Sequence, residues 1–195
     1  MQVYHLQGPA PYSTNCFLAM TEQGSAVLVD PAPSVEQLNE LLEQKQARLT
    51  HILLTHGHFD HVTSTKALRQ QWGCKVYLDL ADTAGSELFP LTAQDVDGAY
   101  QDGGEIWVDE ACFTTWHTPG HTGGSWVIAS QGLLFTGDTL FAGSVGRTDL
   151  GGSPADQRRT LERLKTLPLA PDTSVLPGHG PFSTLAQEFE TNPFF

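Results

Sequence analysis

The sequence feature that most restricts what this chain can fold into is a run of seven residues in its first third, Thr55-His56-Gly57-His58-Phe59-Asp60-His61. It follows apolar and β-branched residues at 50–54, which predict a buried strand, and precedes 62–72, which predict a helix ended by Gly73. Side chains two apart in extended backbone point the same way, so His56 and His58 can converge on one cation. Asp60 and His61 turn away at the start of the helix, toward a second cation. Four ligand-type side chains in six positions therefore imply two metal ions.

Three further candidate ligands follow downstream, each at the end of a predicted strand and each followed by turn residues. They are His121, Asp138 and His179. Imidazole and carboxylate groups are accepted by borderline divalent metals, and neighbouring glycines let the backbone approach an ion closely. The full set of five histidines and two aspartates suits a two-metal hydrolytic site with one bridging carboxylate and an open position for water.

The ligand set and its flanks resemble the metallo-β-lactamase superfamily, and within it a short branch of the glyoxalase II (hydroxyacylglutathione hydrolase) group of thioester hydrolases. The flanks that carry the resemblance are Leu28-Val29-Asp30-Pro31, Gly146-Arg147-Thr148-Asp149-Leu150, Pro177-Gly178-His179-Gly180-Pro181 and Asn192-Pro193-Phe194-Phe195. The resemblance implies that His56, His58 and His121 hold one metal ion. It implies that Asp60, His61 and His179 hold the other and that Asp138 bridges them, with Asp60 and Asp138 as the catalytic carboxylates.

The pattern of elements predicts an α+β fold. Strands are expected at 3–6, 15–20 and 25–30, an amphipathic helix after Ser34, then the ligand strand and helix and a strand at 75–79. Strands at 105–108, 112–117, 125–130 and 133–136 predict a second, largely antiparallel sheet stacked on the first. A helix at 154–167, a strand at 174–176 and a short helix at 184–190 complete the chain. With the resemblance, this is a four-layer αβ/βα sandwich: two stacked mixed sheets with helices outside.

We expect one domain over residues 1–195, without the C-terminal helical domain that holds glutathione in full-length glyoxalase II enzymes. Residues 81–104 lack periodicity and predict a long loop of the functional or mobile kind. The net charge of −12 disfavours nucleic acid and anionic membranes as partners, although bound cations would still attract an anionic substrate. The first residues lack a secretory signal, so we expect a cytoplasmic protein.

Several other residues have plainer interpretations. Cys16, Cys74 and Cys112 are far apart and are expected to be small buried hydrophobes. His5, His51 and His117 lie at no ligand spacing, and we expect buried rings bonded to backbone carbonyls.

Two charged residues have two equally supported interpretations. Asp30, at the end of a strand, either orients a ligand histidine from behind or simply forms a turn. Arg147, in a glycine-rich loop after Asp138, either binds an anionic group of the substrate or pairs with a nearby acid such as Asp149.

The chemistry expected of this site is hydrolysis of a thioester. Two divalent ions activate water without a serine or cysteine nucleophile, and a thiolate with a parent pKa of about 8.5 leaves without a general acid. The resemblance implies a hydroxyacyl thioester, S-lactoylglutathione or a related thiol conjugate, as the small-molecule substrate. The expected cofactors are two divalent metal ions, zinc foremost, with iron or manganese as alternatives because nitrogen and oxygen ligands suit all three.

Other functions remain open on the sequence alone. Gly146-Arg147-Thr148-Asp149 also resembles persulfide dioxygenases of the same fold, in which one iron is held by two histidines and a carboxylate, here His56, His121 and Asp138. A β-lactamase is disfavoured because Asp138 stands where those enzymes usually have another residue. A non-catalytic protein that binds thiol conjugates is the third class. It is disfavoured because such a protein would not need metal ligands with an open coordination position.

Overall fold

The computed structural model describes all residues, 1–195, and its first half forms a five-stranded sheet of order β1-β2-β3-β4-β5. The strands are β1 Gln2–Gln7, β2 Asn15–Met20, β3 Ser25–Val29, β4 Arg48–Leu53 and β5 Lys75–Tyr77. The first three are antiparallel, whereas β4 and β5 join in parallel after helical connections. Parallel joining follows from the alternation of strand and helix in this part of the sequence.

The second sheet has six strands in the order β11-β10-β9-β8-β7-β6. Its strands are β6 Gly104–Val108, β7 Ala111–His117, β8 Trp126–Ser130, β9 Leu133–Gly137, β10 Ser174–Pro177 and the two-residue β11 Ser183–Thr184. Strands β6 to β9 form an antiparallel meander, and β10 pairs with β9 in parallel because helix α3 intervenes. The sheet is thus largely antiparallel, as predicted.

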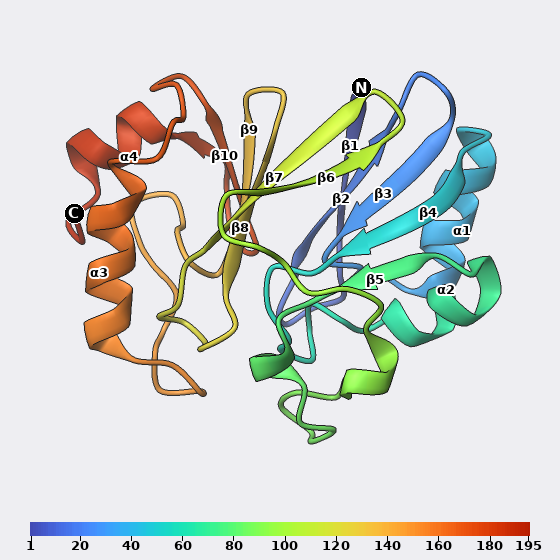
Figure 1. Cartoon of the computed structure of the whole chain (residues 1–195), viewed down its shortest axis with the longest axis horizontal. Coiled ribbons are helices and arrows are strands. Elements are labelled where there is room, and N and C mark those ends of the chain that lie inside the picture. Colours follow the sequence, from blue (N-terminus) through green and yellow to red (C-terminus); the bar gives the residue numbers. More distant parts are fainter.

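Helices cover only the outer faces of the two sheets (Figure 1). Helices α1 Val35–Gln44 and α2 Thr65–Trp72 lie on the first sheet, and α3 Pro154–Leu164 and α4 Leu185–Thr191 on the second. Serine caps α1 and α3, with a full capping box at Ser34 and Pro154 in the first turn of α3. One apolar cluster fills the space between the sheets, and two others lie under the helices. The predicted four-layer sandwich is therefore confirmed.

The connections differ from the prediction in detail. Helix α2 begins at Thr65 rather than Val62, because the residues before it form two successive turns, from His61 to His58 and from Thr65 to Val62. The loop predicted at 81–104 contains two short 3₁₀ turns, Leu80–Asp82 and Ala93–Asp95. No helix is both long enough and apolar enough to span a membrane.

Candidate metal centre

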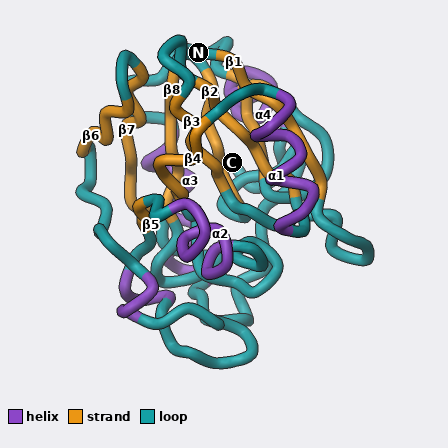
Figure 2. The backbone as a smooth tube through the Cα atoms, turned by 90° about the vertical axis from the view of Figure 1, so that its right-hand side faces the viewer, coloured by secondary structure: helices purple, strands orange, loops and turns teal.

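Loops from both sheets meet at one end of the sandwich, opposite the N-terminus (Figure 2). The loop after β4 carries the seven-residue ligand run, and the loops after β7, β9 and β10 carry His121, Asp138 and His179. Glycine is required where these loops cross: a Cβ on Gly178 would collide with the carboxylate of Asp138 and the ring of His61. The fold therefore brings together all seven side chains predicted as ligands.

The first group of side chains consists of His56, His58 and His121, all buried. The Nδ1 atom of His58 lies 3.1 Å from Nε2 of His56 and 2.9 Å from Nε2 of His121. These three nitrogens are near enough to one another to bind a single cation.

The second group consists of Asp60, His61 and His179. The Nε2 atoms of His61 and His179 are 3.3 Å apart, and Oδ2 of Asp60 lies 3.4 Å from Nε2 of His179. Thr14 donates a hydrogen bond of 2.7 Å to the same Oδ2 atom, which fixes the carboxylate. This group is partly open to solvent, since His179 is about a quarter exposed.

Asp138 lies between the two groups. Its Oδ1 atom is 3.3 Å from Nε2 of His61, and its Oδ2 atom is 3.4 Å from Nε2 of His121 and 3.5 Å from Nε2 of His179. The Oδ1 atom is buried and has no hydrogen-bond partner. A buried carboxylate oxygen without a partner is costly unless a cation or a donor compensates it.

The far ring nitrogen of each histidine in these groups is already engaged. His58, His121 and His179 donate to the backbone carbonyls of Leu150, Arg147 and Tyr12. His61 donates to Asp30, and His56 to the hydroxyl oxygen of Thr55, which itself donates to Asp30. A carbonyl only accepts, so each engaged nitrogen carries the ring proton. In the neutral rings, the nitrogens that face the centre then carry lone pairs.

This arrangement fits divalent cations. The lone pairs of His56, His58 and His121 face one another at about 3 Å with no proton between them, which is repulsive unless they share a cation. Burial, reinforced by neighbouring imidazoles, lowers the pKa of His56 well below its usual value, and burial lowers that of His121. Both rings are therefore neutral and able to coordinate a metal.

The charges around Asp138 also favour a bound divalent cation. Burial raises the pKa of its carboxyl group, but the nearby His61 and His121 outweigh burial and hold the pKa below its ordinary value. The group is therefore ionised at neutral pH, as a bridging ligand must be.

Asp30 contacts the centre from behind. Its Oδ2 atom lies 2.9 Å from Nδ1 of His61 and 2.7 Å from the hydroxyl of Thr55, and its Oδ1 atom accepts the backbone N–H of Thr55. Its φ of 51° lies in the left-handed region, which aspartate tolerates better than most residues. This single carboxylate thus aligns His61 directly and His56 through Thr55.

Asp82 is a second buried carboxylate behind the ligands, and the sequence analysis missed it. It accepts hydrogen bonds from the backbone N–H groups of Gly57 and Gly124 and from the hydroxyl of Thr122. Gly57 separates His56 from His58, and Thr122 follows His121. Asp82 therefore connects the two loops that supply the first group. Burial raises the pKa of its carboxyl group above the ordinary value.

The loop around the 3₁₀ turns also forms part of the site wall. Phe89 packs on the ring of His58 with centroids 4.8 Å apart, and the backbone N–H of Phe59 donates to the carbonyl of Leu88. Phe59 and Tyr12 are exposed and pack edge to face at 5.0 Å beside Asp60. The entrance to the centre is therefore largely aromatic.

No side chain of the remaining candidate residues belongs to either ligand group, although the backbone carbonyl of Arg147 contacts His121. Arg147 pairs with Asp149 at 2.6 Å, and both side chains are well exposed, 62% and 65%. His117 bonds to the carbonyl of Gly123, the kind of partner predicted, but His5 bonds to the side chain of Asn15 and His51 to that of Thr50. The expectation of backbone carbonyl partners was wrong for these two. None of the three is buried as expected, since His5 is exposed and the other two are half-buried. Cys16 and Cys74 are buried, as predicted, whereas Cys112 is only partly buried.

Stacked mixed sheets with a histidine and aspartate centre at one end define the class of metal-dependent hydrolases. The model of the metallo-beta-lactamase superfamily matches residues 9–179, and this chain belongs to that family. Hydroxyacylglutathione hydrolase GloC of Haemophilus influenzae is 32% identical over 197 residues, covering 94% of this chain and 93% of GloC.

Two solved structures show the same fold. The crystal structure of the BLEG-1 B3 metallo-beta-lactamase aligns with a TM-score of 0.86 at 33% identity, over 99% of each chain. That of ETHE1 from Myxococcus xanthus aligns with a TM-score of 0.85 at 30% identity, over 99% of this chain and 84% of ETHE1. The resemblance seen in the motifs is therefore confirmed along nearly the whole chain.

Proposed function

We propose that this protein hydrolyses hydroxyacyl thioesters at a binuclear metal centre, with S-lactoylglutathione or a related thiol conjugate as substrate. One observation carries the proposal: Asp138 lies between two groups of ligand atoms, with one oxygen toward His61 and the other toward His121 and His179. Similarity to GloC, named a hydroxyacylglutathione hydrolase, supports this substrate class.

The seven ligands take the roles suggested by their grouping. His56, His58 and His121 would hold one divalent ion, Asp60, His61 and His179 the other, and Asp138 both. When bound, the two ions activate a water molecule and polarise the substrate carbonyl as Lewis acids. Zinc suits these nitrogen and oxygen ligands, as do iron and manganese.

The protein's own groups orient the reactants. The hydroxyl of Thr14 fixes Oδ2 of Asp60, which would hold this carboxylate beside the second ion and the attacking water. Asp30 and Asp82 hold the ligand histidines in place through hydrogen bonds. The thiolate departs without a proton donor, because its parent pKa of about 8.5 makes it a good leaving group.

The test uses three substrates that share a lactoyl group: the glutathione thioester, an oxygen ester and an amide. We expect metal-loaded protein to release thiol from the thioester and to leave the amide intact, because an amide nitrogen needs protonation to leave. A β-lactam forms a fourth arm, since BLEG-1 is a B3 metallo-beta-lactamase. Faster cleavage of the β-lactam or of the amide than of the thioester would overturn the proposal.

Persulfide dioxygenation is the second candidate, and one contact favours it. Nε2 of His121 and Oδ2 of Asp138 lie 3.4 Å apart, so with His56 they can form the two-histidine, one-carboxylate triad of oxygen-activating iron sites. Iron-loaded protein would then consume oxygen with glutathione persulfide and need one iron per chain. Thioester hydrolysis at two metal equivalents, without oxygen uptake, would exclude this candidate.

A further inference from the structure

A cavity of about 350 Å³ lies at the open edge of the sandwich, between β5 of the first sheet and β6 of the second. Both are edge strands, so their side chains meet there without a further strand to cover them. The cavity is distinct from the metal centre: His51, in its wall, precedes His56 by five residues, roughly 15 Å of extended chain.

The wall of this cavity breaks the hydrophobic pattern of the first sheet. Val27 on β3 pairs with His51 on β4, and His51 pairs with Lys75 on β5. Val27 is buried between the two sheets. Strand alternation places all three on the face that looks toward the second sheet. His51 is half-buried and Lys75, on the edge strand, is exposed, so this row of the sheet ends in two polar side chains that are open to the cavity.

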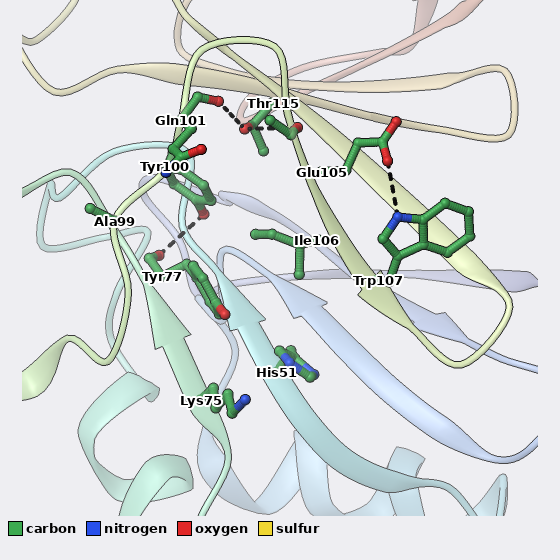
Figure 3. Close-up of a pocket in the computed structure, with 11 residues that line it drawn as sticks. His51, Lys75, Tyr77, Ala99, Tyr100, Gln101, Glu105, Ile106, Trp107 and Thr115 are labelled. Carbon is green, nitrogen blue, oxygen red and sulfur yellow. Dashed lines mark hydrogen bonds between the residues drawn. The ribbon is translucent and has the colours of Figure 1, made fainter.

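Three polar groups in this wall have no partner within the protein. The ammonium group of Lys75 forms no hydrogen bond or ion pair, Nε2 of His51 forms none, and neither does the hydroxyl of Tyr77. Figure 3 shows these three groups on one side of the cavity, facing Ile106 across it. The Lys75 ammonium group is a cation, and it and the Tyr77 hydroxyl can both donate a hydrogen bond. The Thr50 hydroxyl donates to the carbonyl of Ala26 and therefore accepts from Nδ1 of His51, so Nε2 of the neutral ring is an acceptor that donates only when the ring is protonated.

The other groups described in the cavity wall are either apolar or have their polar atoms engaged in hydrogen bonds within the protein. Ile106 and Ala99 contribute aliphatic surface, and the rings of Tyr77 and Tyr100 stack with centroids 6.0 Å apart. The Tyr100 hydroxyl donates to the carbonyls of Leu54 and Tyr77, so it is not free to bind a ligand. The cavity thus offers one anion-binding corner and an apolar remainder.

We infer that this cavity binds a small carboxylate with an apolar or aromatic body. The carboxylate would accept hydrogen bonds from Lys75 and Tyr77, and from Nε2 of His51 once it has drawn a proton to that ring, while the body would lie against Ile106 and the ring of Tyr77. Its volume lies at the lower end of small-molecule pockets, which suits a ligand of benzoate size. This site is independent of the proposed hydrolysis.

Nearby negative charge sets the selectivity of the site. Glu105 lines the rim, where its carboxylate accepts the indole N–H of Trp107, and Asp109 acts on His51 from the neighbouring turn. Glu105 and Asp109 offset the charge of Lys75, so a ligand with two negative charges would be repelled more strongly than a monocarboxylate. Inorganic phosphate, an anion without an apolar body, should accordingly bind more weakly.

The experiment is an NMR titration of the metal-loaded protein, observing the His51 imidazole. Burial, and then the charge of Lys75, lowers the pKa of this ring below its usual value, and a bound carboxylate should raise it. We expect benzoate to cause saturable shifts at millimolar concentration, on the order of 1–10 mM. Benzamide, which has the same shape without the charge, should cause none.

Two variants separate this site from others. Lys75→Gln should weaken benzoate binding about tenfold or more, because a hydrogen bond to a charged group is lost. Lys66→Gln, on helix α2 beside Asp95, should leave it unchanged. Equal shifts with benzamide, unchanged binding in Lys75→Gln, or no saturable shift of His51 at about 10 mM benzoate would each overturn the proposal.

Discussion

The imidazole Nδ1 of His61 and the carboxylate Oδ2 of Asp30 lie 2.9 Å apart, and their side chains are only 0% and 3% exposed. The contact joins the end of β3 to the loop after β4, 31 residues later. It leaves the other nitrogen of His61 directed at Asp138 and His179. An acid outside the ligand set therefore controls how one of the ligands is presented.

Asp30→Asn should weaken metal binding at the second group by about 10–100-fold, because an amide supports the His61 ring less strongly than a carboxylate. Asparagine tolerates a positive φ, so the backbone should be preserved. Competition with a chelator measures the affinity. Asp109→Asn is the matched control, since Asp109 also has a positive φ, 52°, but lies at a turn remote from the centre. Equal effects of both substitutions would contradict the role of Asp30.

Asp138→Ala should lower the content of both metal ions and sharply reduce hydrolysis, because two cations would then face each other with less neutralisation. Asp60→Ala should lower only the second metal equivalent, since Asp60 lies near His61 and His179 alone. Elemental analysis of purified variants measures both. If Asp138→Ala retained two equivalents and near-normal turnover, the bridging role would be wrong.

Asp82→Asn should reduce metal affinity at the first group by about tenfold or more. Asp82 accepts three hydrogen bonds, and the NH₂ group of asparagine would place a donor opposite one of these three donors, so that bond would be lost. Metal titration with a colorimetric chelator reports the change. Asp95→Asn, in the second 3₁₀ turn of the same loop, removes an exposed contact to Lys66 and should change little. The prediction fails if the two variants bind metal equally well.

Arg147→Ala should raise KM for an anionic thioester by about two- to fivefold, with little change for a neutral analogue, because an exposed guanidinium is screened by solvent. The bond to Asp149 adds a second expectation, because this acid competes with a substrate carboxylate for the guanidinium. Asp149→Ala should therefore lower the same KM. Steady-state rates with lactoyl conjugates of glutathione, coenzyme A and a neutral thiol test both, and parallel changes in the two variants would contradict substrate binding by Arg147.

Asp97 should contribute stability that is lost in acid. The hydrogen bond from Arg69 holds the pKa of its carboxyl group below the ordinary value, and the backbone N–H of Val76 also donates to it. A lowered folded-state pKa means that the stabilisation is present above the unfolded value of about 4 and disappears as pH falls through the folded value. Asp97→Asn should therefore lower the free energy of unfolding at pH 7 by about 1 kcal/mol, and urea titrations should show the difference shrinking as the pH falls below the unfolded value of about 4. A constant difference across this range would contradict the assignment.

The ligand set was predictable from the sequence because its spacing is local. His56, His58, Asp60 and His61 lie within one turn, and the flanking glycines mark the other ligands at strand ends. The close spacing of the strands in 105–136 also predicted that the second sheet is largely antiparallel. The restriction to a single domain over 1–195 stays a prediction.

Asp82 was missed because its partners lie far away in sequence. Gly57 precedes it by 25 residues and Gly124 follows it by 42, and neither separation leaves a periodic signal. The available clue was the pair Asp79 and Asp82 just after a short strand. His51 was misjudged for a related reason: only the register between β4 and β5 shows that it stands beside Lys75.

Each group of candidate ligands draws on both halves of the chain. His56 and His58 need His121 to complete one group, and Asp60 and His61 need His179 to complete the other. During synthesis, no ribosome-bound fragment that stops before His179 contains the second set, so full metal loading should wait until His179 has been translated. Metal uptake would then act as a late checkpoint in biogenesis, marking chains whose two sheets have already assembled.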